Sequence, residues 1–353
     1  MKSRLIATVI SFIMTLFGIS FAEPLAPLGS IPVPASNPQT PGKIELGKKL
    51  FFDRRLSGDG TMSCASCHDP EQAFTDGLEI SLSYPTTRNW RNAPTLMNVA
   101  YQKSLFHDGR AASLEEQALF PMMSAFEMNL NLDFLEEKLR SVPEYVDAFQ
   151  KVFGDADITR TRVAMAIASF ERTLISVSAP LDRFLQGDQH ALSAEAKKGY
   201  QLFIGTAGCI RCHYGANLSD DQFHALNIPE NREQEKDPRV AATRRFVAKV
   251  NRYADFRTLD EDPGRYLITK DKKDWKAFKT PTLREISWTA PYMHNGIMAT
   301  LDDVIDFFDK GGGEGNAALK RLNLTREEKH ALKTFLVEAL SGSKSSFSYP
   351  KVP

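Results

Sequence analysis

Cysteine is scarce in this chain. Only four occur among the 353 residues, and none lies outside two short strings of the form C-x-x-C-H. The strings occupy residues 64–68 (CASCH) and 209–213 (CIRCH). Because all four cysteines belong to these strings, none is left to form a separate disulfide framework.

Net charge is lacking as well, since 44 Lys and Arg residues balance 44 Asp and Glu residues. Proteins that bind nucleic acid present clustered positive charge, so we expect no nucleic acid among the partners.

After residue 21 the sequence has no apolar run long enough to span a bilayer. We therefore expect no stable membrane insertion once the N-terminal segment has been removed.

Residues 1–22 have the pattern of a secretory signal peptide. Lys2 and Arg4 precede an apolar run over residues 5–21, and Ala22 is followed by a polar, proline-rich stretch. This pattern predicts cleavage after Ala22 and export to the periplasm. The alternative is an uncleaved membrane anchor, because the run approaches the ~20 residues that a span requires.

The two C-x-x-C-H strings predict two covalently bound haems c. Two thiols three positions apart can bond the two vinyl groups of one porphyrin, and the adjacent imidazole then becomes the proximal iron ligand. The attachment residues would be Cys64, Cys67, Cys209 and Cys212, with His68 and His213 as proximal ligands. A zinc site or a thioredoxin-like dithiol would also use C-x-x-C. The histidine that follows both pairs favours haem.

The periodicity of the sequence predicts an all-α fold. Capping-box patterns begin apolar stretches at Ser113 and Thr325, residues 158–175 carry apolar side chains at helical spacing, and alternating runs typical of strands are scarce. We expect two cytochrome c-like domains, residues 23–187 and 188–353, each with one haem.

The chain also repeats itself. Pro94-Thr95-Leu96 matches Pro281-Thr282-Leu283 without gaps, and the match continues until His107 and Gly109 align with His294 and Gly296. The repeated element could be duplicated scaffold. Its position downstream of a haem motif in both halves favours a shared role in building a haem pocket.

Four further motifs accompany the haem strings: FDRRLS at residues 52–57, RNAPTL at 91–96, DGRAASLEEQ at 108–117 and KTPTLR at 279–284. Through them nearly the whole mature chain resembles the bacterial di-haem cytochrome c peroxidases and the related MauG-type enzymes. The resemblance implies that hydrogen peroxide reacts at the first haem, while the second haem exchanges electrons with a periplasmic redox or substrate protein.

The resemblance also assigns individual residues. It aligns Gln117 and Glu127 with a distal-pocket glutamine and a catalytic glutamate, and it aligns Asn92 and the carbonyls of Thr289 and Pro291 with the ligands of a calcium ion between the haems. A positioned carboxylate can move the proton that cleavage of the O–O bond requires. Glu127 could instead be a solvated glutamate and Gln117 a helix-surface residue.

Several positions depart from the usual pattern of the peroxidases. No histidine lies between His68 and His107, and Pro121, which has no donor side chain, occupies the distal position of the first half. We therefore expect the first haem to be open opposite His68. Arg110 would either organise the pocket or serve as a structural ion-pair partner. His107 falls where well-studied relatives have a tryptophan between the haems.

The sequence does not identify the distal ligand of the second haem. Counting from Thr289 and Pro291 places it at Phe308, where relatives have Met or Tyr, and phenylalanine cannot coordinate iron. His294, Met298 and Met293 are nearby substitutes.

The expected activity follows from the resemblance and these departures. Peroxide would form high-valent iron at the first haem with Glu127 as proton shuttle, and the enzyme would then oxidise a partner protein, as MauG does. The alternatives are a cytochrome c peroxidase that takes electrons from a small cytochrome or copper protein, and a di-haem electron carrier with two closed haems.

Overall fold

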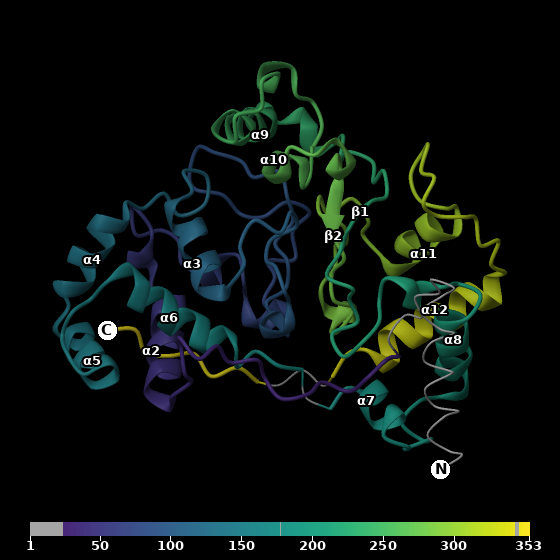
Figure 1. Ribbon diagram of the computed structural model, residues 1–353, viewed down its shortest axis with the longest axis horizontal. Helices are drawn as coiled ribbons and strands as arrows, with labels where there is room; N and C mark the ends of the chain where they lie inside the picture. Colours follow the sequence, from purple (N-terminus) through teal and green to yellow (C-terminus); the bar gives the residue numbers. More distant parts are fainter. Residues whose placement is uncertain (1–23, 177, 343–345) are drawn as a thin grey trace, which may run out of the picture.

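The computed structural model describes residues 24–176, 178–342 and 346–353. The predicted signal peptide lies outside these residues. The described chain is mostly helical, and the only sheet in it has two short antiparallel strands (Figure 1). None of the described helices is long and apolar enough to cross a membrane.

The helices alternate with long loops and short 3-10 turns. In the first half the helices are α2 (Pro41–Phe52), α3 (Leu114–Met123), α4 (Leu132–Arg140), α5 (Pro143–Phe153), α6 (Arg160–Glu171) and α7 (Pro180–Leu185). The second half contains α8 (Ala194–Ile204), β1 (Phe223–Ala225), α9 (Pro238–Val250), α10 (Tyr266–Thr269), β2 (Ala277–Lys279), α11 (Leu301–Asp309) and α12 (Arg326–Ala339).

The predicted helix starts are confirmed. The Ser113 hydroxyl accepts a hydrogen bond from the backbone N–H of Glu116 at 3.1 Å and thereby caps α3. Thr325 and Glu328 form a complete capping box at the start of α12. These side chains satisfy N–H groups that the first helical turn leaves without a partner.

Each half is built around one tightly crossed helix pair. In the first half α2 crosses α6 at Gly47, and a Cβ atom placed there would lie 1.8 Å from the Ala166 carbonyl oxygen. In the second half α8 crosses α12 at Gly199, where a Cβ would lie 2.0 Å from the Ala331 oxygen. Any side chain at either glycine would force the helices apart, so glycine is required by close approach and not by backbone conformation.

Two hydrophobic cores follow from these pairs. The first is formed by residues between Leu46 and Leu174, and the second contains Leu25 together with residues between Leu181 and Leu340. The ends of the chain cross over, because Leu25 packs in the second core whereas Phe347 packs against the first. The domain boundary between residues 187 and 188 stays a prediction.

The segment between β1 and β2 forms a protrusion, which contains α9 and α10 and lies at the top of Figure 1. Phe223 pairs with Lys279 in the two-stranded sheet, so the protrusion leaves and re-enters the fold at one place. It has a small core of its own, made of Ala248, Leu259 and Leu267. The sequence analysis did not predict this substructure.

Candidate haem and peroxide site

The two C-x-x-C-H strings adopt the same local structure. Residues 64–66 and 209–211 each form a 3-10 turn, and all four cysteines are free and partly buried. In both strings the backbone N–H of the histidine donates to the carbonyl of the first cysteine at 3.0 Å. Each turn therefore fixes two thiols and one imidazole in one short unit.

Each of these imidazoles has its Nδ1 engaged by a backbone carbonyl. The Nδ1 of His68 lies 2.9 Å from the Phe74 carbonyl oxygen, and the Nδ1 of His213 lies 3.0 Å from that of Leu218. A carbonyl only accepts, so both rings carry their proton on Nδ1 and present a bare Nε2. Burial lowers the pKa of both histidines, which keeps them in the neutral form that binds iron. The residues thus fit two haems.

The thiols fit the dithiol alternative poorly. Burial raises the pKa of Cys64, Cys67 and Cys209, whereas a redox-active dithiol needs a stabilised thiolate. One cluster with metal-ligand chemistry does occur among the described residues, formed by Cys212, Asp220 and His224. It contains only one cysteine of the second string, so it does not reproduce a C-x-x-C zinc site.

Glu127 lies on the loop that follows α3, within electrostatic range of the first string. Its carboxylate is one of the charges that add to burial in raising the pKa of the Cys67 thiol. The loop is anchored by the backbone N–H of Gly58, which donates to the Met128 carbonyl at 2.8 Å. Burial raises the pKa of Glu127 itself, while Arg110 and Ser124 oppose the shift. A partly buried carboxyl with a raised pKa suits proton transfer, and the catalytic role of Glu127 stays a prediction.

The other residues predicted for this pocket lie in α3 and in the loop before it. Gln117 is partly buried in α3, and Pro121 lies in the same helix one turn further on. The Arg110 guanidinium lies 3.4 Å from the centre of the Phe106 ring and 2.9 Å from an Asp108 carboxylate oxygen. Arg110 is therefore an ion-pair partner of Asp108, and its positive charge also opposes the rise in the pKa of Glu127.

In the second half the repeat aligns α11 with α3, and the cluster around α11 is apolar. Phe308 lies in α11 and packs in a cluster with Met293 and the buried Met298. His294 lies elsewhere, stacked on the Phe278 ring with centroids 3.6 Å apart. Both ring nitrogens of His294 are buried without a hydrogen-bond partner among the described residues, so this imidazole is available to a group that protein atoms do not provide. The second distal ligand stays open.

Asn92 links the two repeated histidines. Its carbonyl accepts from the Nε2 of His107 at 3.0 Å, and its backbone N–H donates to the His294 carbonyl at 2.7 Å. The side-chain Nδ2 of Asn92 donates to the Leu78 carbonyl at 2.6 Å, which leaves its Oδ1 as a free oxygen ligand. Asn92 thus contacts the segment that contains Thr289 and Pro291, a placement that suits the expected calcium ligands; the calcium site itself stays a prediction.

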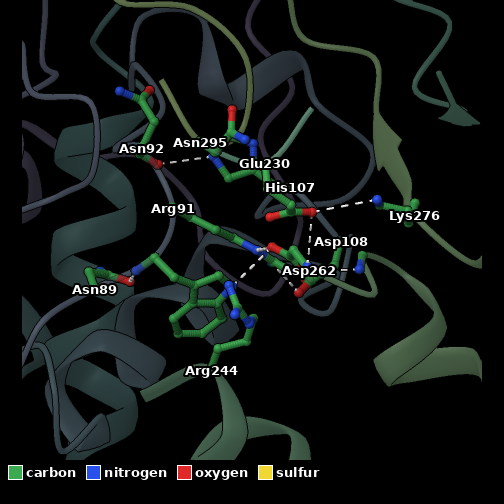
Figure 2. A network of polar contacts seen from close by, with 12 residues as sticks. Asn89, Arg91, Asn92, His107, Asp108, Glu230, Arg244, Asp262, Lys276 and Asn295 are labelled. Carbon is green, nitrogen blue, oxygen red and sulfur yellow. Dashed lines mark hydrogen bonds and ion pairs between the residues drawn. The ribbon is translucent and has the colours of Figure 1, made fainter. Parts of the chain in front are cut away.

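A buried ionic network joins the two halves next to these residues (Figure 2). Arg91 donates to Asp262 at 2.6 and 2.9 Å and to Asp108 at 2.6 Å, and the indole Nε1 of Trp90 donates to Asp262 at 2.9 Å. The two carboxylates raise the pKa of Arg91 although burial acts to lower it. No sequence pattern predicted this network. Arg91 and Asp108 belong to the motifs at residues 91–96 and 108–117, but no motif contains Asp262, which lies 171 residues from Arg91.

A second carboxyl, that of Glu171, also lies within electrostatic range of the first string. Glu171 in α6 is 3% exposed, its Oε2 has no hydrogen-bond partner among the described residues, and its charge contributes to the raised pKa of Cys64. Burial raises the pKa of Glu171 to about 8. The group is therefore largely protonated at neutral pH.

Replacing Glu171 with glutamine should stabilise the protein most at alkaline pH. A carboxyl whose pKa rises from 4.5 to about 8 on folding destabilises the native state progressively between these pH values, by roughly 1.4 kcal/mol per pH unit. Glu171→Gln removes this penalty, so its thermal midpoint should exceed that of the wild type more at pH 8 than at pH 5. An equal gain at both pH values would show that Glu171 does not titrate in this range.

Comparison with known proteins places these features in a family. A family model described as di-haem cytochrome c peroxidase matches residues 41–190. The chain is 45% identical to cytochrome-c peroxidase IdrP1 of Pseudomonas sp. (strain SCT), over 91% of this chain and 86% of that protein. It is 35% identical to the methylamine utilization protein MauG of Methylorubrum extorquens, over 92% and 85%.

A solved structure agrees with this result. The crystal structure of a MauG-like protein associated with microbial copper homeostasis superposes with a TM-score of 0.74 and 29% identity, covering 92% of this chain and 95% of that one. The sequence relatives each cover about nine tenths of this chain. The chain therefore belongs to the family of di-haem cytochrome c peroxidases and MauG enzymes.

Proposed function

We propose that this enzyme reduces hydrogen peroxide to water in the periplasm, beside the haem held by Cys64, Cys67 and His68, with electrons from a partner protein. When bound, that haem supplies the iron that accepts peroxide and the redox chemistry that cleaves the O–O bond. The observation that carries the proposal is the carboxyl of Glu127, which is partly buried, has a raised pKa and lies within electrostatic range of Cys67.

The reaction consumes two electrons and two protons for each peroxide and releases two water molecules. Glu127 takes the proton from one peroxide oxygen and returns it to the other, which leaves as water. Its raised pKa suits this exchange, because a carboxyl that is too acidic would not pick up the proton. Gln117 orients the peroxide through its amide. Arg110 is held in place by its ion pair with Asp108 and supplies positive charge to the pocket.

A second candidate function is oxidation of an aromatic residue in a substrate protein, the MauG-like reaction. Phe308 favours it, because phenylalanine cannot provide the Met or Tyr ligand that would set the reduction potential of the second haem for electron entry. His107 favours it too, since the electron path between the haems then differs from that of the well-studied peroxidases. Both candidates require the same open first site.

Spectra and turnover of the holoenzyme test the proposal. The resting oxidised protein should show a high-spin ferric band from the first haem, and peroxide should oxidise a reduced small cytochrome c or copper protein with two electrons per peroxide. Slow donor turnover with rapid spectral reaction would favour the protein-modifying candidate. Two low-spin haems that do not respond to peroxide would instead identify an electron carrier.

A further inference from the structure

Three oxidisable aromatic side chains meet in the protrusion between β1 and β2. Tyr266 and Trp275 have ring centroids 5.2 Å apart, Tyr253 lies 6.0 Å from Tyr266, and Tyr253 lies 6.2 Å from Trp275. All three are partly exposed. We call them the aromatic triad. The proposed peroxide chemistry does not use them.

One route leads from the triad to the first site through Trp90. Val247 of α9 packs against the small core of the protrusion, as Tyr253 and Trp275 do, and it also packs against the cluster that contains Trp90. The Trp90 ring meets the Phe126 ring edge-on with centroids 5.4 Å apart. Phe126 immediately precedes Glu127, so aromatic and aliphatic contacts connect the surface of the protrusion with the peroxide pocket.

Further routes lead from the triad to the two repeated histidines. Arg265, the neighbour of Tyr266, donates through Nη1 to the Asp108 carbonyl at 2.9 Å, and Asp108 follows His107. On the other side, Trp275 lies three residues before Phe278, which stacks on His294 at 3.6 Å. Short covalent and hydrogen-bonded paths therefore join the triad to the place where the two halves meet.

The charges around Trp90 suit the loss of an electron. The Asp262 carboxylate accepts the indole N–H at 2.9 Å, and the Arg91 guanidinium lies 5.3 Å from the ring centre. A carboxylate that accepts the indole N–H favours a positive charge on the ring.

We propose that the aromatic triad, connected through Trp90, is the surface relay by which electrons from the partner protein reach the peroxide site. This inference rests on the proposed function. Each peroxide takes two electrons and two protons and becomes two waters. Each electron is drawn in turn from Trp90 and then from the triad; an oxidised tyrosine releases its phenolic proton to solvent. One electron from the donor protein, with one proton from solvent, restores each oxidised side chain.

The first test asks where the oxidation lies when no donor is present. Holoenzyme treated with hydrogen peroxide and a nitroso spin trap should form an adduct that peptide mass spectrometry locates between residues 253 and 275. The adduct should be lost there in the triple variant Tyr253→Phe, Tyr266→Phe, Trp275→Phe, and also in Trp90→Phe. Phenylalanine keeps a ring in the core at each site but is much harder to oxidise. Should the triple variant not fold, Trp275→Phe alone carries the test.

The second test measures turnover with the donor protein. The triple variant should oxidise the reduced donor severalfold more slowly than the wild type while its spectral reaction with peroxide is unchanged. The matched control is Tyr349→Phe, because Tyr349 is an exposed tyrosine that packs on Phe52 of α2, outside the protrusion. It should retain wild-type donor turnover and the adduct between residues 253 and 275.

The outcomes separate the relay from the function on which it rests. An adduct located elsewhere, or wild-type donor turnover in the triple variant, would overturn the relay while leaving the peroxidase proposal intact. Equal loss of turnover in Tyr349→Phe would overturn it as well. If peroxide produces no spectral change in wild-type holoenzyme, the proposed function itself fails.

Discussion

Replacing Glu127 with glutamine should slow the reaction with hydrogen peroxide by about 10²-fold to 10⁴-fold, the usual contribution of a positioned general acid–base group. Glutamine keeps the size and polarity of the side chain but cannot accept and return a proton. Both haems should remain attached, because Glu127 takes no part in the C-x-x-C-H turns. Stopped-flow absorbance after mixing with peroxide measures the rate, and the haem content of the purified protein measures attachment.

Glu171→Gln is the matched control for this experiment. Glu171 is also a buried carboxyl with a raised pKa close to the first string, but it acts on Cys64 whereas Glu127 acts on Cys67. Because Glu171 is largely protonated at neutral pH, glutamine replaces a neutral group with a neutral group. Its peroxide rate should stay near that of the wild type. Equal losses in both variants, or none in Glu127→Gln, would remove Glu127 from the mechanism.

The local features of the molecule were predictable from the sequence. The cap at Ser113, the box at Thr325 and the helix over residues 160–171 follow from bonds between residues three or four positions apart, which a sequence pattern records directly. The same holds for the two haem strings, where Cys-x-x-Cys-His fixes five consecutive residues. The resemblance aligned Glu127 with a catalytic glutamate, and its catalytic role remains a prediction.

What the sequence did not predict depends on contacts between distant segments. Asp262 joins Arg91 across 171 residues and lies in a stretch without a recognisable motif, so neither periodicity nor spacing marks it. The crossing of the chain ends, with Leu25 in the second core and Phe347 against the first, has no local signature either. Tyr253, Tyr266 and Trp275 meet only because the two short strands close the protrusion.

Replacing Arg91 with methionine should destabilise the protein by about 3–5 kcal/mol, because removal of one partner leaves buried charges without compensation. Asp262 and Asp108 are 2% and 3% exposed, and Arg91 is the cation that both of them contact. Methionine retains much of the apolar stem, so the loss reports mainly on charge. Urea or thermal unfolding of the holoenzyme at pH 7 measures it.

Two comparisons isolate the buried charges. Arg239→Met removes a cation from an exposed pair with Asp237 and should leave the unfolding midpoint close to the wild-type value. The double variant Arg91→Met, Asp262→Asn should recover part of the stability, since the most buried unpaired carboxylate is then gone. A double variant no more stable than Arg91→Met would place the loss in packing rather than in charge.

The pH dependence gives the network an independent signature. In the wild type Arg91 keeps the pKa of Asp262 well below its usual range although burial acts to raise it, so the pair contributes stability above an unfolded pKa of about 4 that is lost as the pH falls through the folded value. Without Arg91, burial alone raises this pKa, and the carboxylate then penalises folding above about pH 4 but not below it. The stability deficit of Arg91→Met should therefore be largest at neutral pH and shrink toward pH 4. A deficit independent of pH would mean that Asp262 and Asp108 are not the groups that Arg91 compensates.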